Sequence, residues 1–582
     1  MIAQFTMRVR EYKKDVIISI ILMVLAVILE VIIPYLMAVI IDSGIMAGSM
    51  SAILITGGFL IIAALVSLVF GLFSAKYRAV ATAGFAKNTR KDLYYHVSNF
   101  SFQNIERFST PSLITRLTTD INSVQAAFGL FVQVCSRSPL IMVFSLFMAF
   151  TINARLALVF VFVLPFLGIL LYIVISVAFP LFRIALKTYD NLNRVVSENL
   201  KGIRVVKSFV REDYEVEKFK KVSTKMYTTF SAAEKIVAFF NPSMQLAIYI
   251  CMILIAWFGA HMIVAEDMTI GQLMSFIIYI NQILFALIMI SMLFITLAMS
   301  RASAERIQEV FNEEISLVNP ENPITKINDA TIEFENVYFS YSSKKYVLEN
   351  INLKIESGQT VGILGGTGSS KTSLVQLIPR LYDVTQGNIK LGGIDVRQLD
   401  LATIRDFVTI VLQKNTLFSG TIVENLRWGN LNATQKEIED VCKMAQAHDF
   451  IVSMPNGYET FIEQGGANLS GGQKQRLSIA RALLKKPKII IFDDSTSAVD
   501  TTTEEKILEA IKTTLPESTK IIISQRIASV KDLNTIILLD NNKILASGNH
   551  SYLIKNSEIY REIYSSQSKE DIWSEEDLAP NQ

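Results

Sequence analysis

The chain has 582 residues, of which 51% are hydrophobic and 19% charged, and its mean hydropathy of +0.38 excludes an ordinary soluble protein of this size. The formal net charge of +2 hides no basic block, so nucleic acid is not an expected partner. The composition changes near residue 300, from long apolar runs to a mixed texture punctuated by glycines. These features predict a membrane protein with two domains.

Six segments of the first half are candidates for membrane-spanning helices, because a bilayer core of about 30 Å needs about 20 apolar residues. They lie near 16–40, 52–73, 139–152, 156–180, 236–264 and 272–298. We expect the third to be the weakest, since Arg137 lies at its start. The links after the second and fourth segments are much longer than the others and have helical periodicity, so the helices should continue past the membrane.

The two long links also carry most of the cations of this half, among them Lys87, Arg90, Arg204 and Lys207. Cationic links lie on the cytoplasmic side, which places the links, both termini and everything after the sixth segment there. We expect the chain to turn back around 108–113 and 210–219, and such turns could dock onto another domain.

Few polar residues interrupt the apolar segments. Asn281 and Gln282 either line a substrate path or form hydrogen bonds between helices. Glu30 either lies near the membrane surface or acts on a substrate or a proton. The sequence leaves both pairs of alternatives open.

A glycine-rich loop in the second half follows a buried strand predicted at 359–364 and precedes a helical pattern. The loop residues are Gly365, Gly366, Thr367, Gly368, Ser369, Ser370, Lys371, Thr372 and Ser373. Such a loop wraps phosphates with backbone N–H groups, while a Lys reaches the outer phosphates and a hydroxyl holds Mg²⁺. Ser370 departs from the strict pattern, which has Gly there, so a plain strand-to-helix turn is the alternative.

Two further motifs follow. An apolar strand at 489–492 ends in Asp493 and Asp494, which suits a carboxylate beside Mg²⁺ but also a helix cap. The second motif opens the helical run 474–484 and consists of Leu469, Ser470, Gly471, Gly472 and Gln473. It is an anion site without a Lys or a carboxylate of its own, so it fits a loop that faces the nucleotide of a partner chain.

The order of these motifs resembles the ATP-binding cassette (ABC) family. The ordered set comprises Tyr341, the loop to Lys371 and Thr372, Gln413, the segment 469–473, Asp493 with Asp494, and the segment 497–500. The six-segment domain ahead of it resembles the exporter branch of that family. The resemblance implies a membrane all-α six-helix transmembrane domain at 1–310 and a cytoplasmic α/β P-loop nucleotide-binding domain at 331–565. The composition of the chain adds a linker at 311–330 and an acidic tail at 566–582.

The resemblance also implies the cofactors ATP and Mg²⁺ and a role for each motif. Tyr341 would stack on adenine, the glycine-rich loop would hold the phosphates, and Thr372, Gln413 and Asp493 would hold Mg²⁺. The segment from Leu469 to Gln473 and Asp500 would complete the pocket of a second half-transporter chain. The two cytoplasmic turns would correspond to the family's coupling helices.

Three residues depart from the family pattern, and all address the same ATP. Asp494 stands where the family has Glu, Gln525 where it has His, and Ser370 where it has Gly. A shorter carboxylate falls short of the attacking water, and an amide cannot shuttle a proton. The chain thus resembles the degenerate-site subunit of bacterial heterodimeric multidrug ABC exporters.

This resemblance predicts ATP-driven efflux of amphipathic small molecules across the cell membrane, with a heterodimeric partner chain and the lipid bilayer around it. The alternatives are a homodimeric lipid or peptide flippase, and a regulatory membrane protein gated by nucleotide.

Overall fold

The computed structural model describes residues 7–341, 345–366, 368–495 and 500–567, and part of α7 and α9 by backbone alone. The chain divides into two compact units. One comprises Met1–Ser98 and Thr110–Glu313, and the other Asn99–Ser109 and Glu314–Gln582. The short segment 99–109 therefore belongs with the second unit, although it lies inside the sequence of the first.

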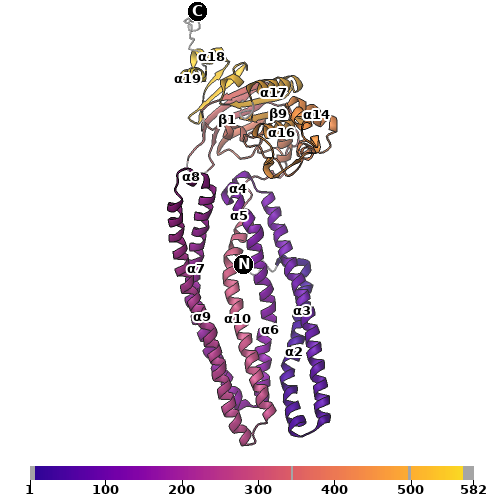
Figure 1. Cartoon of the computed structure of the whole chain (residues 1–582). Helices are drawn as coiled ribbons and strands as arrows, with labels where there is room; N and C mark the ends of the chain where they lie inside the picture. The colour runs from indigo at the N-terminus through magenta and orange to yellow at the C-terminus, as the bar shows by residue number, and fades with distance from the viewer. Residues whose placement is uncertain (1–6, 342–344, 367, 496–499, 568–582) are drawn as a thin grey trace, which may run out of the picture. The chain divides into compact units, whose positions relative to one another are not determined.

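Six long helices build the first unit (Figure 1). They are α2 (Lys13–Val39), α3 (Met50–Ser98), α6 (Ile121–Ile152), α7 (Ala154–Lys201), α9 (Glu212–Val264) and α10 (Ile270–Phe311). A helix satisfies its backbone polar groups internally, which an apolar environment demands. Within the fully described residues, four helical stretches are long and apolar enough to cross a membrane: Arg8–Met46, Met50–Ser98, Thr110–Ile152 and Ile270–Phe311. A shorter apolar helix covers Ile248–Val264.

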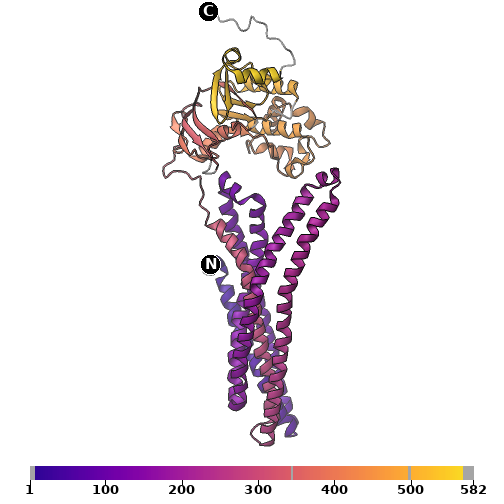
Figure 2. The ribbon, with the colours of Figure 1, turned by 90° about the vertical axis from the view of Figure 1, so that its left-hand side faces the viewer.

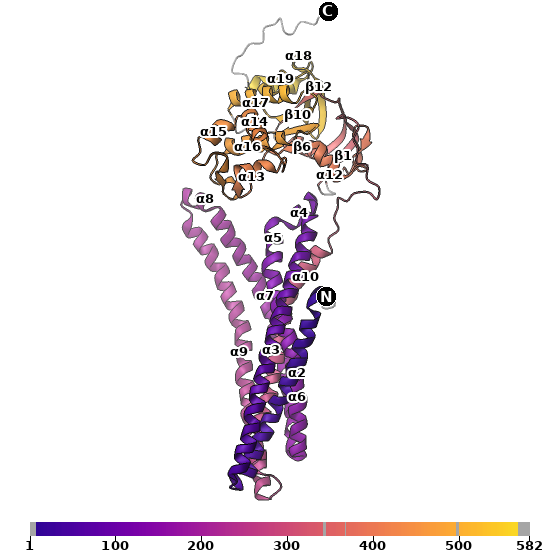
Figure 3. The ribbon, with the colours of Figure 1, turned by 90° about the vertical axis from the view of Figure 1, so that its right-hand side faces the viewer.

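The long helices of the first unit extend well beyond their apolar segments, as the sequence predicts. Figures 2 and 3 show α7 and α9 as a pair that splays away from the other long helices toward the end that carries α8. Shorter elements join the long ones. They are η1 (Met7–Tyr12), η2 (Ile40–Met46), α5 (Thr110–Thr115), η3 (Arg116–Asp120) and α8 (Ile203–Ser208).

The predicted positions of the two turns between the long helices are wrong by a few residues. The first turn contains α4 (Phe102–Phe108), which begins earlier than 108–113 because Ser101 and Asn104 form a capping box at its start. The second contains α8, which precedes 210–219 because α7 ends at Lys201 with Gly202 as its C-cap. Helical periodicity alone does not reveal such breaks between two helical stretches.

The second unit is built on three sheets. The largest has the order β12-β11-β3-β10-β9-β6, parallel except for the edge strand β12. Its strands are β12 (Lys543–Gly548), β11 (Thr535–Asp540), β3 (Thr360–Leu364), β10 (Thr519–Ser524), β9 (Ile489–Asp493) and β6 (Val408–Val411). The central strands are near-continuous apolar runs, as expected of parallel strands covered on both faces. The carboxyl ends of β3, β9 and β10 therefore lie at one edge of this sheet.

The other sheets are smaller. An antiparallel sheet has the order β2-β1-β4-β5, from β1 (Ile332–Phe339), β2 (Leu348–Ile355), β4 (Gln386–Leu391) and β5 (Ile394–Asp395), and a short pair joins β7 (Gly420–Thr421) to β8 (Phe461–Ile462). The helices are α11 (Lys371–Gln376), α12 (Leu401–Phe407), α13 (Ile422–Arg427), α14 (Gln435–Met444), α15 (His448–Val452), α16 (Gly471–Leu484), α17 (Thr501–Thr514), α18 (His550–Asn556) and α19 (Glu558–Gln567), with short 3-10 turns η4 (Gly457–Glu459), η5 (Gln464–Gly466) and η6 (Ile527–Ser529). Two apolar cores pack this unit, one on each face of the large sheet.

Candidate functional site

The glycine-rich loop joins β3 to α11, as predicted. The Lys371 ammonium is buried and donates hydrogen bonds to the carbonyl oxygens of Gly365 at 2.8 Å and Gly366 at 2.7 Å, and to the Ser369 hydroxyl at 3.3 Å. Burial lowers the pKa of Lys371, against the opposing effect of Asp494 and Asp493. The loop therefore gathers a cation at a helix start, the arrangement that holds phosphate.

Gly365 and Ser370 show why the loop needs small residues. A Cβ on Gly365 would lie 2.2 Å from the Leu539 carbonyl oxygen, so only glycine fits. Ser370 has φ of 72°, in the left-handed region that favours glycine. Its hydroxyl donates to Asn542 Oδ1 at 3.2 Å, which partly offsets the backbone strain. The loop thus tolerates Ser370 in place of glycine, at a cost in backbone strain. Thr367 lies outside the described residues.

Asp493 ends β9 beside the loop. It is 1% exposed, its Oδ1 accepts the Thr372 hydroxyl at 2.9 Å, and among the described residues its Oδ2 has no hydrogen-bond partner. Burial raises the pKa of Asp493. A buried carboxylate oxygen without a donor fits a cation, and Mg²⁺ is commonly held by one carboxylate, a hydroxyl and nucleotide phosphates. Where side chains are described, no cluster of three metal-binding groups exists, so phosphate oxygens would have to supply most of the coordination.

Asp494, Gln413 and Gln525 meet at one carboxylate oxygen. Asp494 Oδ2 accepts the Gln413 side-chain amide at 3.0 Å and the Gln525 side-chain amide at 3.2 Å. The Asp494 backbone, with φ of 45°, is tied to β10 through its N–H and the Ile523 carbonyl at 3.1 Å. Two departures from the family pattern therefore contact each other and the candidate metal ligand Gln413.

Tyr341 lies beside α11. Its hydroxyl is 2.9 Å from the Ser373 hydroxyl, and its ring meets the Tyr382 ring edge-on at 5.1 Å. Burial raises the pKa of Tyr341, so the phenol stays neutral. Its proximity to the loop helix is compatible with stacking on the base of a nucleotide held by that loop.

The segment from Leu469 to Gln473 forms the start of α16. Ser470 is the N-cap and forms a capping box with Gln473: the Gln473 N–H donates to the Ser470 hydroxyl at 3.3 Å, and the Ser470 N–H donates to the Gln473 side-chain oxygen at 2.9 Å. Ser470 and Gly471 are exposed and Gly472 is half-buried. Asp500 caps α17 by accepting the Thr503 N–H at 2.9 Å, whereas 496–499 lie outside the described residues.

A contact that the sequence reasoning missed joins α4 to this region of the second unit. The Tyr382 hydroxyl donates to the Glu106 carboxylate at 2.9 Å, and the Phe102 ring lies 6.1 Å from the Tyr382 ring. Because Tyr382 also contacts Tyr341, a chain of aromatic rings connects α4 with the candidate base-stacking residue. No local pattern marks Tyr382, since its partners are distant in sequence.

The polar residues of the first unit form contacts between helices. Arg137 and Glu30 form an ion pair at 2.7 Å between α6 and α2. Gln282 donates to the Glu30 carbonyl at 3.3 Å and accepts the Ser145 hydroxyl at 2.9 Å. Asn281 is exposed and bonds the Ile277 carbonyl of its own helix at 2.7 Å. Gln282 thus forms hydrogen bonds between helices, whereas Asn281 forms one within its own helix.

Comparison with known proteins identifies both halves of the chain. The ABC transporter transmembrane region matches residues 16–288, and the ABC transporter family matches residues 348–497. The uncharacterized ABC transporter ATP-binding protein YfiB of Bacillus subtilis is 36% identical over 551 residues, which cover 94% of this chain and 96% of the relative. The probable multidrug resistance ABC transporter YheI of the same organism is 32% identical, with 83% of each chain covered.

Two more comparisons extend this picture. An ATP-dependent lipid A-core flippase of Desulfotalea psychrophila is 30% identical over 83% of this chain and 84% of the relative. A bacterial Atm1-family ABC exporter with ATP bound shares the fold, with a TM-score of 0.83 over 97% of this chain and 99% of the other at 22% identity. With its helical membrane domain and its nucleotide-binding domain, the chain belongs to the ABC transporter family, and it is an exporter-type transport ATPase.

Proposed function

We propose that this chain is the degenerate-site subunit of a heterodimeric ABC exporter. The observation that carries the proposal is the Asp494 carboxylate, which accepts the amides of Gln413 and Gln525. A catalytic carboxylate must instead point at the attacking water, and Asp is one methylene too short for this. The chain's own pocket would bind ATP with Mg²⁺ at Asp493 and Thr372 and hydrolyse it slowly.

The start of α16 supports the second half of the proposal. Its capping box is complete, and Ser470 and Gly471 are exposed, so this helix start can face an anion from outside this chain. The departures from the family pattern are confined to this chain's own pocket, whereas the segment that would serve the partner's pocket is intact. This asymmetry favours a partner that supplies the competent catalytic residues. In this arrangement Ser470, Gly471 and Gly472 would act in the faster pocket.

The exported molecules would be amphipathic small molecules. The support comes from the multidrug resistance relative, while the lipid A-core flippase keeps a lipid substrate as the second candidate. Asn281, exposed on α10, is the residue we propose for the substrate path. Because the long links are cationic, both termini and the second unit would lie in the cytoplasm, and the first unit would cross the plasma membrane.

The test compares Ser470→Ala with Lys371→Ala in the chain co-purified with its partner in lipid, by steady-state ATP hydrolysis. A heterodimer predicts a loss of tenfold or more for Ser470→Ala and a smaller loss for Lys371→Ala. Thr434→Ala is the matched control, because Thr434 forms the capping box of α14 with Glu437. A homodimer predicts equally large losses for both variants, and ordinary turnover by the unaccompanied chain would reject the proposal.

A further inference from the structure

The segment that follows β10 is fastened by the last described residue of α19. The Gln567 side-chain amide donates to the Gln525 carbonyl oxygen at 2.7 Å, and its oxygen accepts the Ile527 N–H at 2.8 Å. We refer to 525–527 as the switch segment. One side chain therefore bridges both ends of this three-residue segment from a helix some forty positions later in the sequence.

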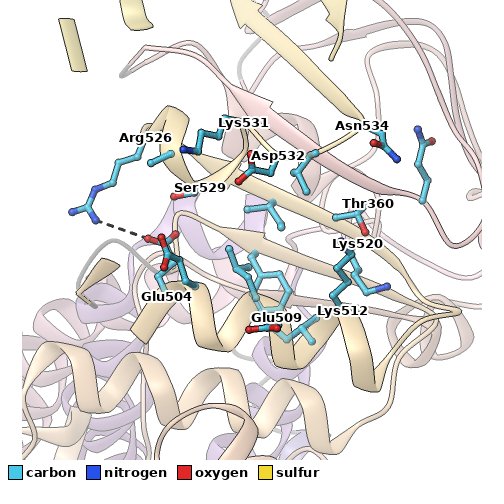
Figure 4. Close-up of a pocket in the computed structure, with 18 of the residues that line it drawn as sticks. Thr360, Glu504, Glu509, Lys512, Lys520, Arg526, Ser529, Lys531, Asp532 and Asn534 are labelled. Atoms are coloured by element: carbon cyan, nitrogen blue, oxygen red, sulfur yellow. Dashed lines mark ion pairs between the residues drawn. The ribbon is translucent and has the colours of Figure 1, made fainter. Parts of the chain in front are cut away.

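A cavity lies against the switch segment, which increases the importance of these hydrogen bonds. The cavity has a volume of about 620 Å³, and Arg526 and Ser529 line it on one side and Glu504 of α17 on the other. Figure 4 shows Arg526 reaching across to Glu504, an ion pair with a long separation of 3.9 Å. Only the buried Ile527 anchors the segment in the apolar core. Where packing is sparse, hydrogen bonds determine the backbone position.

The support for the switch segment is itself firmly placed. Tyr560 of α19 is fully buried, and its hydroxyl lies 2.7 Å from His550 Nδ1 at the start of α18. The His550 ring also meets the Tyr564 ring at 5.2 Å. Tyr560 and Tyr564 therefore anchor α19, and Gln567 reaches the switch segment from the end of this helix.

We propose that Gln567 is a positioning residue for Gln525, and that α19 thereby sets the rate of ATP hydrolysis in this chain's own pocket. Gln567 holds the backbone carbonyl of Gln525, and the side-chain amide of Gln525 donates to Asp494. A shift of the Gln525 backbone therefore moves the amide that contacts Asp494. This inference rests on the proposed function only in assigning that pocket to slow hydrolysis. ATP binding depends on Lys371 and Tyr341, which Gln567 does not contact.

Two variants and a pair of truncations test the inference in the full chain. Gln567→Ala removes both hydrogen bonds, while Gln567→Glu keeps an acceptor for the Ile527 N–H but loses the donor to Gln525. Deletion of 568–582 retains Gln567, and deletion of 567–582 removes it. Ser566→Ala is the matched control, since among the described residues the Ser566 hydroxyl donates only to the Ile563 carbonyl of its own helix.

The first readout is hydrogen–deuterium exchange, which does not require hydrolysis. Loss of a hydrogen bond should speed exchange across the switch segment about fivefold or more in Gln567→Ala and in the longer deletion. Gln567→Glu should protect Ile527 better than Gln567→Ala does. Ser566→Ala and the shorter deletion should match the unaltered chain. Unchanged exchange in Gln567→Ala, or equal acceleration throughout the second unit, would overturn the inference.

The second readout is single-turnover ATP hydrolysis in the transport complex whose other pocket has been silenced in the partner. We expect Gln567→Ala to raise the rate about threefold or more without a change in the KM for ATP, because a displaced Gln525 no longer holds the Asp494 carboxylate back. A parallel change in KM, or no change in rate, would overturn the inference. Rapid hydrolysis by the unaltered chain would instead reject the degenerate pocket and leave the exchange result standing.

Discussion

Replacement of Asp494 by Glu tests whether side-chain length limits hydrolysis in this pocket. One added methylene carries the carboxylate about 1 Å further out, and a 1 Å misplacement is worth about a hundredfold in rate, or about 2.7 kcal/mol. Extension also breaks the hydrogen bonds from Gln413 at 3.0 Å and Gln525 at 3.2 Å, which stabilise the present position by about 1 kcal/mol each. The net gain is about 0.7 kcal/mol, so Asp494→Glu alone should raise the rate only about threefold.

Combination with Gln525→His removes one of the two amides, which leaves a net gain of about 1.7 kcal/mol and should raise the rate about eighteenfold. The assay is single-turnover ATP hydrolysis with the partner pocket silenced, and Asp494→Asn, equal in length to Asp, is the control that should show no gain. A full hundredfold gain from Asp494→Glu alone would refute the inference that the two amides hold the carboxylate back. No gain in the double variant would refute the role of length.

Three further predictions follow from the described contacts. In a thermal-shift assay, ATP with Mg²⁺ should stabilise the unaltered chain more than ATP alone does. Asp493→Asn should abolish this difference, because the buried carboxylate oxygen loses its charge. An unchanged effect of Mg²⁺ would contradict the assignment of Asp493 as a metal ligand. Glu30→Gln should lower the unfolding free energy by about 1 kcal/mol, a small value because the ion pair with Arg137 is about one-third exposed. The double variant Glu30→Gln with Arg137→Gln should recover part of this loss when unfolding is measured in detergent. Equal losses in the single and double variants would argue against the pairing. Burial lowers the pKa of His550 in the folded state, so the unfolded chain takes up the proton first and stability should fall as the pH drops below about 6.5. His550→Asn should make this decline shallower when thermal unfolding is followed against pH. Equal slopes for the two proteins would contradict the prediction.

Much of the fold is predictable because its signals are local. Long apolar runs set the membrane helices, and the isoleucine runs of β9 and β10 mark strands covered on both faces. The turns at α4 and α8 are harder to position from the sequence, because their flanking helices share one periodicity and caps such as Ser101 separate them. The inclusion of 99–109 in the second unit depends on distant contacts and leaves no local trace.

The candidate site likewise contains residues that local patterns predict and residues that only the fold brings together. The loop at Lys371 and the cap at Ser470 can be read from spacing, since one backbone conformation generates each of them. The convergence of Gln413 and Gln525 on Asp494 requires three strand ends to meet, which only the sheet order determines. Gln567 falls within the predicted tail at 566–582 because that segment has an acidic composition, yet its side chain bonds two backbone groups of another loop.

The assignment of 99–109 to the second unit also bears on how this unit can be isolated. A fragment that begins at Glu314 would omit α4, leaving the Tyr382 hydroxyl without Glu106 and one edge of the Tyr382 ring without Phe102. Asn104, which donates to the Glu314 carbonyl at 2.9 Å, would be lost as well. The excised domain would therefore present a newly exposed aromatic surface next to Tyr341, and nucleotide affinities measured on it would describe a differently supported pocket.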